Sequence, residues 1–341
     1  MKLFIKLLII FFVLIFSIII IFLFWASSGI SGKKPLSGIK IFTENINDVI
    51  KKQPFTIMTY NCGYFSGMRN NIAVSSSKDF YIHNLDNFIK ILREHPPEII
   101  CFQEIDFNSK RSHYINQMDY LSGYLKYKYG AYAVNWNKRY VPFPYWPPSA
   151  HFKKILSGQS VLSVFPIRKS NRIVLEMPKN PFYYNLFYLN RLIQTTEIKI
   201  NNKIIIVMNI HLEAFDKKTR EKQSAHVLKY YRKNFKNKFP VIILGDFNCV
   251  RPDAEKKNNF EDEPETDYYG EKTIELFLDE ESLTSAMPYS KPDSNTFPSV
   301  NPDRKLDFIF FTKNKIEMIK SDILHVKSSD HLPLLMQFNL K

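Results

Sequence analysis

The stretch Val241-Ile-Ile-Leu-Gly-Asp-Phe-Asn248 is the most informative part of this 341-residue chain. Its first four residues are apolar and rich in β-branched side chains, which is typical of a short strand. A glycine, a carboxylate and an amide follow directly after them. Because the end of a rigid strand is a common place for functional side chains, we expect Asp246 and Asn248 to belong to a site.

Polar side chains accompany the other predicted strands in the same way. They are Asn61 after Thr-Ile-Met-Thr-Tyr, Glu104 after Ile-Ile-Cys-Phe-Gln, Asn209 and His211 in Ile-Val-Met-Asn-Ile-His, Asp307 in Lys-Leu-Asp-Phe-Ile, and Asp330-His331 in Ser-Ser-Asp-His-Leu-Pro. Each of them alone is equally well explained as a turn or cap residue. Together they supply oxygen and imidazole groups and no thiolate cluster. That set suits a hard cation such as Mg²⁺ or Mn²⁺ working on a phosphate.

Strand-like and helix-like segments alternate along the chain beyond residue 54, and no linker rich in Pro, Gly or Ser divides them. Strands are predicted at Phe55–Asn61, Glu98–Gln103, Ala131–Trp136, Ser160–Phe165, Leu192–Ile200, Lys203–Ile210, Val241–Gly245, Lys305–Thr312, Met318–Val326 and Leu334–Asn339. Helical spacing of apolar residues occurs in Leu85–Leu92 and in Leu228–Phe235, the latter with Asp216 as N-cap, and a shorter helix is predicted over Thr273–Asp279. This order predicts one α/β domain.

The first residues form an apolar run that can cross a membrane. Leu7–Trp25 contains 19 residues, with Ser17 as its only clearly polar member. At about 1.5 Å per residue, such a helix matches a bilayer core of about 30 Å. We therefore expect an anchor at residues 1–26, a polar tether at 27–53 and a domain at 54–341, on the non-cytoplasmic side of the membrane. The alternative is a signal peptide that is cleaved near Ala26.

Composition narrows the partners without naming one. Hydrophobic residues make up 45% and charged residues 23% of the chain, so it can build a large core and is not intrinsically disordered. There are 47 Lys and Arg against 33 Asp and Glu, a net charge of +14. That excess suits a phosphate-bearing partner, and it is equally explained by a Lys-rich codon bias. Cys62, Cys101 and Cys249 follow no metal-binding spacing, and we expect them to be small buried hydrophobes beside the motifs.

In this order, the motif segments resemble the endonuclease/exonuclease/phosphatase superfamily, which contains deoxyribonuclease I, apurinic endonucleases, inositol-polyphosphate 5-phosphatases and neutral sphingomyelinases. The resemblance covers essentially all of Phe55–Lys341. It implies an α/β (α+β) fold, a four-layered sandwich of two packed β-sheets flanked by helices, here preceded by one N-terminal transmembrane helix. It also implies a divalent-metal-dependent phosphoric ester hydrolase whose site lies at one edge of the sheets.

The resemblance implies a metal shell and a base. Glu104 is the expected metal carboxylate, and Asn61 and Asp330 complete or support that shell. The expected cofactor is Mg²⁺, with Mn²⁺ as the alternative. Phosphoester cleavage also needs a group that orients and partly deprotonates the attacking water, and Asp246 is expected to be that group.

The remaining site residues are expected to contact the phosphate. His331 would donate to a phosphate oxygen or help with proton transfer, and Asp307 would orient and charge it. His211 and Asn209 would hold the non-bridging oxygens. Asn248 would donate to the substrate phosphate.

The substrate is less determined by the sequence than the reaction. Tyr140-Val-Pro-Phe-Pro-Tyr-Trp-Pro-Pro148 is either a loop that covers a sheet edge or an aromatic lip at the membrane interface, beside a lipid headgroup pocket. The expected partners are therefore a phosphate ester, such as a lipid headgroup or nucleic acid, and the membrane; no protein partner is implied. A membrane-anchored or secreted nuclease is the first alternative, and a catalytically silent membrane-tethered binding module the second. A deep pocket beside Tyr140–Pro148 favours a headgroup, whereas an open basic groove favours nucleic acid.

Overall fold

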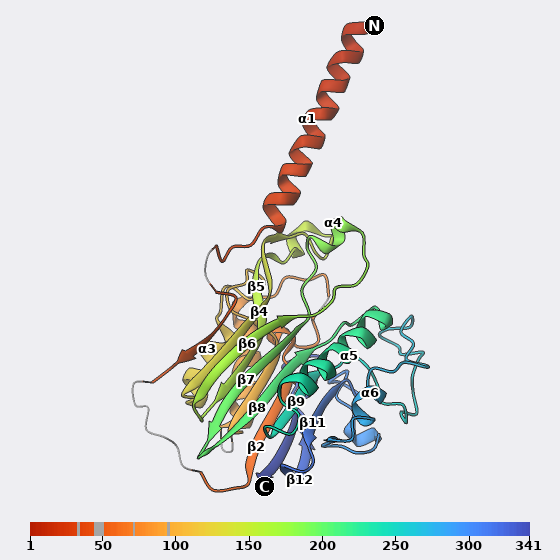
Figure 1. Cartoon of the computed structure of the whole chain (residues 1–341). Coiled ribbons are helices and arrows are strands. Elements are labelled where there is room, and N and C mark those ends of the chain that lie inside the picture. Colours follow the sequence, from red (N-terminus) through yellow and green to blue (C-terminus); the bar gives the residue numbers. More distant parts are fainter. Residues whose placement is uncertain (33–34, 44–50, 71, 94–95) are drawn as a thin grey trace.

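Two mixed β-sheets pack face to face in the body of the protein (Figure 1). The computed structural model describes residues 1–32, 35–43, 51–70, 72–93 and 96–341. The seven-stranded sheet has the order β1 (Ser37–Ile41), β4 (Tyr129–Val141), β5 (Lys153–Ser163), β3 (Ile99–Asp106), β2 (Phe55–Asn61), β13 (Leu334–Leu340) and β12 (Ile316–Ile323). The six-stranded sheet has the order β10 (Leu283–Ser285), β11 (Asp307–Thr312), β9 (Val241–Asp246), β8 (Lys203–His211), β7 (Leu192–Ile200) and β6 (Ile167–Val174).

Helices cover the outer faces of both sheets and complete four layers. The helices are α1 (Lys2–Ser27), α2 (Lys78–Leu92), α3 (Gln117–Leu125), α4 (Phe182–Asn185), α5 (Lys217–Asn234) and α6 (Glu275–Leu278). One buried apolar cluster lies between the sheets, a second lies under α2 and α3, and a third lies under α5 and α6. The predicted sandwich is confirmed, because these three cores separate four layers.

All ten predicted strands form, but β5 begins at Lys153 instead of Ser160 and β4 extends to Val141 instead of Trp136. Asp216 caps α5 by accepting a hydrogen bond from the Thr219 backbone N–H at 2.7 Å. Strands β1, β6 and β10 and helices α3 and α4 were not expected from the sequence. Strand β1 corrects the prediction of a polar tether over residues 27–53, because Ser37–Ile41 pairs antiparallel with β4 at the edge of the sheet. An edge strand with one paired side and partly polar residues carries little hydrophobic signal.

Gly245 lets β9 lie close to β8 just before the site. Its φ is +142°, and a Cβ atom added there would lie 1.9 Å from the carbonyl oxygen of Ile210. No other residue fits this position without moving the backbone. The glycine of the opening motif is therefore a packing requirement that places Asp246 at the end of β9.

Replacing Gly245 by Ala is expected to lower the free energy of unfolding by more than about 1 kcal/mol, because Ala meets both the strained backbone and the Ile210 carbonyl. Gly123→Ala is the matched control, since Gly123 lies in α3 and an added Cβ would meet nothing within 4 Å. That control should be neutral or stabilising. Chemical denaturation of the detergent-solubilised chain measures both free energies of unfolding. Equal changes in the two variants would show that Gly245 is not required for the packing of β9 against β8.

Helix α1 projects from the body as an isolated apolar rod (Figure 1). It has 26 residues, its most apolar 18-residue window has a mean hydropathy of 3.6, and none of that window is buried against the rest of the chain. It therefore has the length and composition of a membrane span or of a signal sequence, and it is not a core helix. Its last turn contacts the body, because the Phe22 and Tyr140 ring centroids are 5.9 Å apart.

Candidate active site

The predicted site residues come together at one edge of the two sheets, with the exception of Asn209. Parallel strands β2 and β3 end at Asn61 and near Glu104, and parallel strands β8 and β9 end at His211 and Asp246. Strand β11 runs antiparallel to β9 and begins at Asp307, directly opposite Asp246. Asp330 and His331 enter from the loop before β13. The pairing of the strands thus collects segments that lie far apart in the sequence.

Asp246 is the buried carboxylate at the centre of the site. Its Oδ1 accepts a hydrogen bond from the Asn248 amide at 2.8 Å, and its Oδ2 accepts one from Asn61 Nδ2 at 2.9 Å. Burial raises the pKa of Asp246 to about 7, with a smaller raising effect from Asp307 that opposes the lowering effect of His331. A fixed carboxylate with a pKa near neutrality is suited to accept a proton from water.

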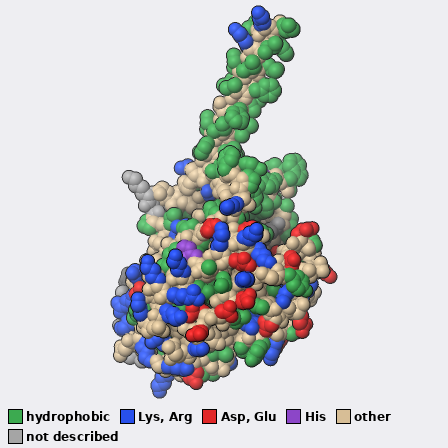
Figure 2. Space-filling view, turned by 45° about the vertical axis from the view of Figure 1, so that its right-hand side comes forward, with side chains coloured by type: hydrophobic (Ala, Val, Ile, Leu, Met, Phe, Trp, Pro, Cys, Tyr) green, Lys and Arg blue, Asp and Glu red, His purple; other side chains and the backbone are tan. Residues whose placement is uncertain are grey.

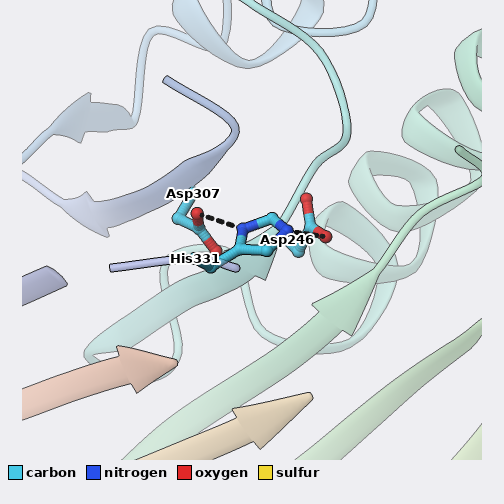
Figure 3. Close-up of side chains that lie close together, drawn as sticks. All are labelled: Asp246, Asp307 and His331. Carbon is cyan, nitrogen blue, oxygen red and sulfur yellow. Dashed lines mark hydrogen bonds and ion pairs between the residues drawn. The ribbon is translucent and has the colours of Figure 1, made fainter. Parts of the chain in front are cut away.

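His331 lies between two carboxylates (Figure 3). Its Nδ1 is 2.9 Å from Asp307 Oδ2, and its Nε2 is 3.9 Å from Asp246 Oδ2. Burial lowers the pKa of His331, but the negative charges of Asp307 and Asp246 outweigh it and raise the pKa to about 10. The ring is therefore protonated at neutral pH and can donate a proton from Nε2 while Asp307 holds it in place.

Glu104 is turned into the site by an irregularity in β3. The register between β3 and β5 shifts between Phe102 and Ile105, and Glu104 has a φ of +51°. A β-bulge with a left-handed residue is a common device for redirecting a side chain at a functional site. The Glu104 carboxylate then lies near that of Asp330, and Asn70 Nδ2 donates to both, at 3.1 Å to Glu104 Oε2 and 3.0 Å to Asp330 Oδ2.

These oxygens fit the expected divalent cation. Burial and the charge of Asp330 raise the pKa of Glu104, so two partly buried carboxylates repel each other across a shared amide. Gly63 leaves the space beside them open, since a Cβ there would lie 2.7 Å from Asp330 Oδ1. Carboxylate and amide oxygens are the ligands that Mg²⁺ and Mn²⁺ prefer, so Glu104, Asp330 and Asn61 would hold the ion.

A second group of potential ligands lies nearby. Asp246, Asp307 and His331 have ligand atoms within 4.8 Å of one another. A protonated imidazole offers no lone pair to a metal, and both ring nitrogens of His331 face carboxylates. We therefore expect the Asp246–Asp307–His331 group to take part in proton transfer and the Glu104–Asp330 pair to bind the cation.

His211 is in the site but does not offer a proton there. Its Nε2 is 2.5 Å from Arg191 Nη1, and a guanidinium only donates, so Nε2 accepts and the proton lies on Nδ1. Burial, Arg191 and His331 lower the pKa of His211 well below 6.5, which keeps the ring neutral. In this arrangement Arg191 supplies the positive charge beside His211, whose expected contact with the phosphate stays a prediction.

Asn209 departs from its expected role of holding a phosphate oxygen. It is fully buried between the sheets. Its Nδ2 donates to the Phe102 carbonyl at 3.0 Å and to Gln194 Oε1 at 3.1 Å, and its Oδ1 accepts from Gln103 Nε2 at 2.6 Å. Asn209 lies two residues before His211 on the same face of β8, so its side chain lies further along the strand from the site and deeper between the sheets. It joins the two sheets beneath the catalytic groups.

A pocket of about 470 Å³ lies over the site. Its polar end contains Asn61, Asn70, Glu104, Arg191, His211, Asp246, Asn248, Asp330 and His331. Its apolar wall includes Trp136, Phe143, Tyr145, Phe152, Tyr184 and Phe187. Among the described residues that line it, Arg111 and Arg191 are the only Lys or Arg side chains. Val141, Phe143 and Tyr145 of the Tyr140–Pro148 loop therefore line this pocket, whose described lining has few basic side chains.

Sequence reasoning missed several members of the pocket. Asn70 lies in a loop without a recognisable motif, and no pattern in the sequence singles it out. Arg191 directly precedes β7, and Asp307 begins β11, so attention to strand beginnings as well as strand ends would have found Arg191. Tyr188 and Glu213 support Arg191, with the Tyr188 hydroxyl 2.6 Å from Glu213 Oε1 and Arg191 Nε 3.6 Å from Glu213 Oε2.

The three cysteines are buried and unpaired, as expected. Burial raises the pKa of the Cys62, Cys101 and Cys249 thiols well above the usual value. A buried neutral thiol is a poor nucleophile and a poor metal ligand. These side chains therefore belong to the packing around the site.

Solved structures share this fold over most of the chain. An endonuclease/exonuclease/phosphatase from Bacteroides vulgatus is 16% identical with a TM-score of 0.58, covering 85% of this chain and 100% of that one. The human Nocturnin catalytic domain, solved with a bound sulfate, is 17% identical with a TM-score of 0.57, covering 92% and 99%. A mannosyl-6-phosphatase from Bacteroides thetaiotaomicron is 14% identical with a TM-score of 0.56, covering 84% and 100%.

Sequence comparison agrees with the fold. No curated protein sequence matches the chain. A family description does match, over residues 58–331, and this range extends from within β2 to His331 and contains all the site residues described above. The chain therefore belongs to the Endonuclease/Exonuclease/phosphatase family.

Proposed function

We propose that the chain is a metal-dependent hydrolase of a phosphodiester or phosphomonoester in a lipid headgroup at a membrane surface. The observation that carries the proposal is the division of one pocket into a polar end with the acid and His groups and an aromatic wall. A phosphorylated headgroup fits the polar end, and the apolar part of a lipid fits the aromatic wall. The apolar helix α1 would hold the enzyme at its substrate, as a single-pass anchor with the catalytic domain on the non-cytoplasmic side.

The residues divide the work of hydrolysis among them. Asp246 would hold the attacking water and take its proton, and the protonated His331 would give a proton to a phosphate or leaving-group oxygen. The Arg191 guanidinium and the side-chain Nδ2 of Asn248, which has one hydrogen beyond the one it donates to the Leu212 carbonyl, would hold the non-bridging oxygens. A divalent cation at Glu104 and Asp330 would neutralise the phosphate and stabilise the charge that develops in the transition state.

A nucleic acid fits this pocket less well than a headgroup. A polyanion is held by a series of cationic contacts along its backbone, whereas the pocket has Arg111 and Arg191 as its described Lys or Arg residues. Arg111 is also already paired, with Nε and Nη2 at 3.1 Å and 3.0 Å from the Asp106 carboxylate. The basic run Lys229–Lys238 begins in α5, away from the pocket lining. On the face in Figure 2, Lys and Arg side chains are scattered among acidic ones.

A substrate panel tests the proposal. The detergent-solubilised full chain is assayed with Mg²⁺ or Mn²⁺ against sphingomyelin, phosphatidylinositol phosphates, an aryl phosphodiester, plasmid DNA and RNA. We expect hydrolysis of at least one lipid and of the aryl ester, at rates far above those on DNA and RNA. Faster cleavage of nucleic acid than of any lipid would contradict the lipid assignment. Absence of any activity that distinguishes wild type from Glu104→Gln would favour the silent binding module.

Mg²⁺ binding has a stability readout that is independent of turnover. Saturating Mg²⁺ is expected to raise Tm by roughly 5 °C, since a ligand at 100 times Kd adds about 2.7 kcal/mol to the free energy of unfolding. Glu104→Gln should raise Tm without metal, because it removes the repulsion between Glu104 and Asp330, and should abolish the Mg²⁺ effect. A full Mg²⁺ shift in this variant would place the ion elsewhere.

A further inference from the structure

An aromatic collar stands exposed at the foot of helix α1. We define it as Phe143, Tyr145 and Trp146, in the loop after β4, together with Phe182 and Tyr183 of α4. The exposed fractions are 78% for Trp146, 75% for Phe182 and 67% for Tyr145. Apolar side chains gather at this end of the body in Figure 2, and α4 lies beside the foot of α1 in Figure 1. A soluble surface rarely presents several large aromatic side chains together.

The residues just before the collar loop contact the end of α1. Arg139 donates from its backbone N–H to the Ser28 carbonyl and from Nε to Ser28 Oγ, both at 2.9 Å. The next residue, Tyr140, contacts Phe22 of the helix, and the collar loop begins two residues further on. The two parts of the collar are themselves joined through β4, since Trp136 Nε1 donates to the Phe187 carbonyl at 2.8 Å just after α4. The collar therefore lies where α1 leaves the body.

The collar and the pocket share two residues. Phe143 and Tyr145 belong both to the collar and to the wall of the pocket, and Tyr184, the residue after Tyr183 in α4, lines the same wall. Trp146, Phe182 and Tyr183 point outward and are not part of the lining. The collar thus joins an outer apolar surface to the inner wall that leads to the catalytic groups.

We propose that the aromatic collar lies in the headgroup region of the membrane that α1 enters, and that it turns the mouth of the pocket toward that leaflet. The occupant of this surface is lipid, because the collar is continuous with an apolar helix long enough to span a bilayer. Aromatic side chains are the residues that favour the interface between water and hydrocarbon. The substrate would then enter sideways from the leaflet, a step that rests on the proposed lipid hydrolysis; the insertion of the collar does not.

Spin labelling of the full chain in phosphatidylcholine nanodiscs tests the insertion. Trp146→Cys is labelled with a nitroxide, and the native cysteines remain unlabelled because all three are buried. Ile319→Cys is the matched control, since Ile319 is 47% exposed on β12, at the opposite end of the body from α1. We expect the label at 146 to be more accessible to oxygen than to a water-soluble nickel complex, and the label at 319 to show the reverse. Equal accessibility at the two positions would overturn the proposal.

The alternative to membrane insertion is that the collar packs against a second copy of the chain. The spin labels at position 146 distinguish these two cases. With two chains per nanodisc, collar-to-collar contact would give a single short distance between the labels at 146 in a dipolar experiment. That result would overturn the membrane assignment. Membrane insertion predicts a broad distribution of distances.

Activity measurements on a lipid and on a water-soluble substrate test the collar independently of the catalytic residues. Trp146→Ser combined with Phe182→Ser is expected to lower activity on lipid in vesicles by at least about tenfold, since two aromatic side chains leave the interface. Activity on the water-soluble aryl phosphodiester should stay unchanged, because neither residue lines the pocket. Equal losses on both substrates would overturn the docking role. Absence of lipid hydrolysis in the wild type would remove the lipid substrate and leave the labelling result standing.

Discussion

Asp246→Asn is expected to lower kcat on the aryl phosphodiester by roughly 10²- to 10⁴-fold, the usual contribution of a positioned general base. The carboxylate is buried, has a pKa of about 7, and is fixed by hydrogen bonds from the Asn248 amide and Asn61. Asparagine keeps the size of the side chain and loses the ability to take a proton. KM should change little, because the other groups that bind the substrate remain.

The folded state of Asp246→Asn is the control for that result. The neutral variant avoids the cost of a buried carboxylate but loses one of its two acceptor oxygens, so it should fold with a Tm within a few degrees of the wild type. Its Tm should also still respond to Mg²⁺, because Glu104 and Asp330 are intact. Near-native turnover in a folded variant would remove Asp246 as the base.

The variant His331→Ala is expected to lose activity to a similar extent, roughly 10²- to 10⁴-fold in kcat, because it removes the expected proton donor. Asp307→Asn is the positioning counterpart. Its carboxylate lies 2.9 Å from His331 Nδ1 and helps to raise the pKa of that ring to about 10. The loss in Asp307→Asn should be smaller, because the imidazole remains in place.

The dependence of activity on pH shows whether Asp307 orients and charges His331 or only packs against it. The donor must be protonated, so wild-type activity should fall as the pH rises through about 10, the pKa of His331. Asp307→Asn removes a negative charge that favours the protonated ring, so its alkaline limb should move to lower pH. An alkaline limb at the wild-type position, together with lost activity, would make Asp307 a structural residue only.

The sequence predicted an α/β domain because its central strands are strongly apolar and end in unusual polar groups, and the resemblance carried by those groups implied the sandwich. Val241–Asp246 and Phe55–Asn61 are buried along almost their whole length, so both their existence and their ends are visible in the pattern of residues. Strand β6, in contrast, is mostly polar and only partly buried, and β1 pairs with a single neighbour. Their strand conformation depends on partners that are distant in the sequence, which a local pattern cannot reveal.

The sequence predicted which residues lie in the site better than it predicted what each of them does. Asn209 and His211 share one face of β8, and only the three-dimensional arrangement shows that one lies between the sheets while the other reaches the pocket. Arg191 sets which nitrogen of His211 carries the proton by donating to its Nε2, a contact between residues twenty positions apart. Motifs identify the groups that take part, whereas hydrogen-bond directions decide which of them can give or take a proton.

The aromatic wall of the pocket was likewise only partly predictable from the sequence. The sequence marked Tyr140–Pro148 as unusual and left it open between a covering loop and a lipid-facing lip. The structure adds α4, whose Tyr184 lines the same pocket from a segment about forty residues away. The pocket could not be predicted from either segment alone.

Hydrolysis in water labelled with ¹⁸O tests the central claim most directly, because it reports which atom is attacked and by what. The full chain is incubated with Mg²⁺ and the aryl phosphodiester in H₂¹⁸O, and the products of a single turnover are examined by mass spectrometry. We predict one ¹⁸O atom in the phosphate product and none in the alcohol, with no phosphorylated enzyme trapped by acid quench, at a rate that Asp246→Asn lowers by roughly 10²- to 10⁴-fold. Label in the alcohol, or a phosphorylated enzyme trapped during the turnover, would contradict direct attack by a water held at Asp246.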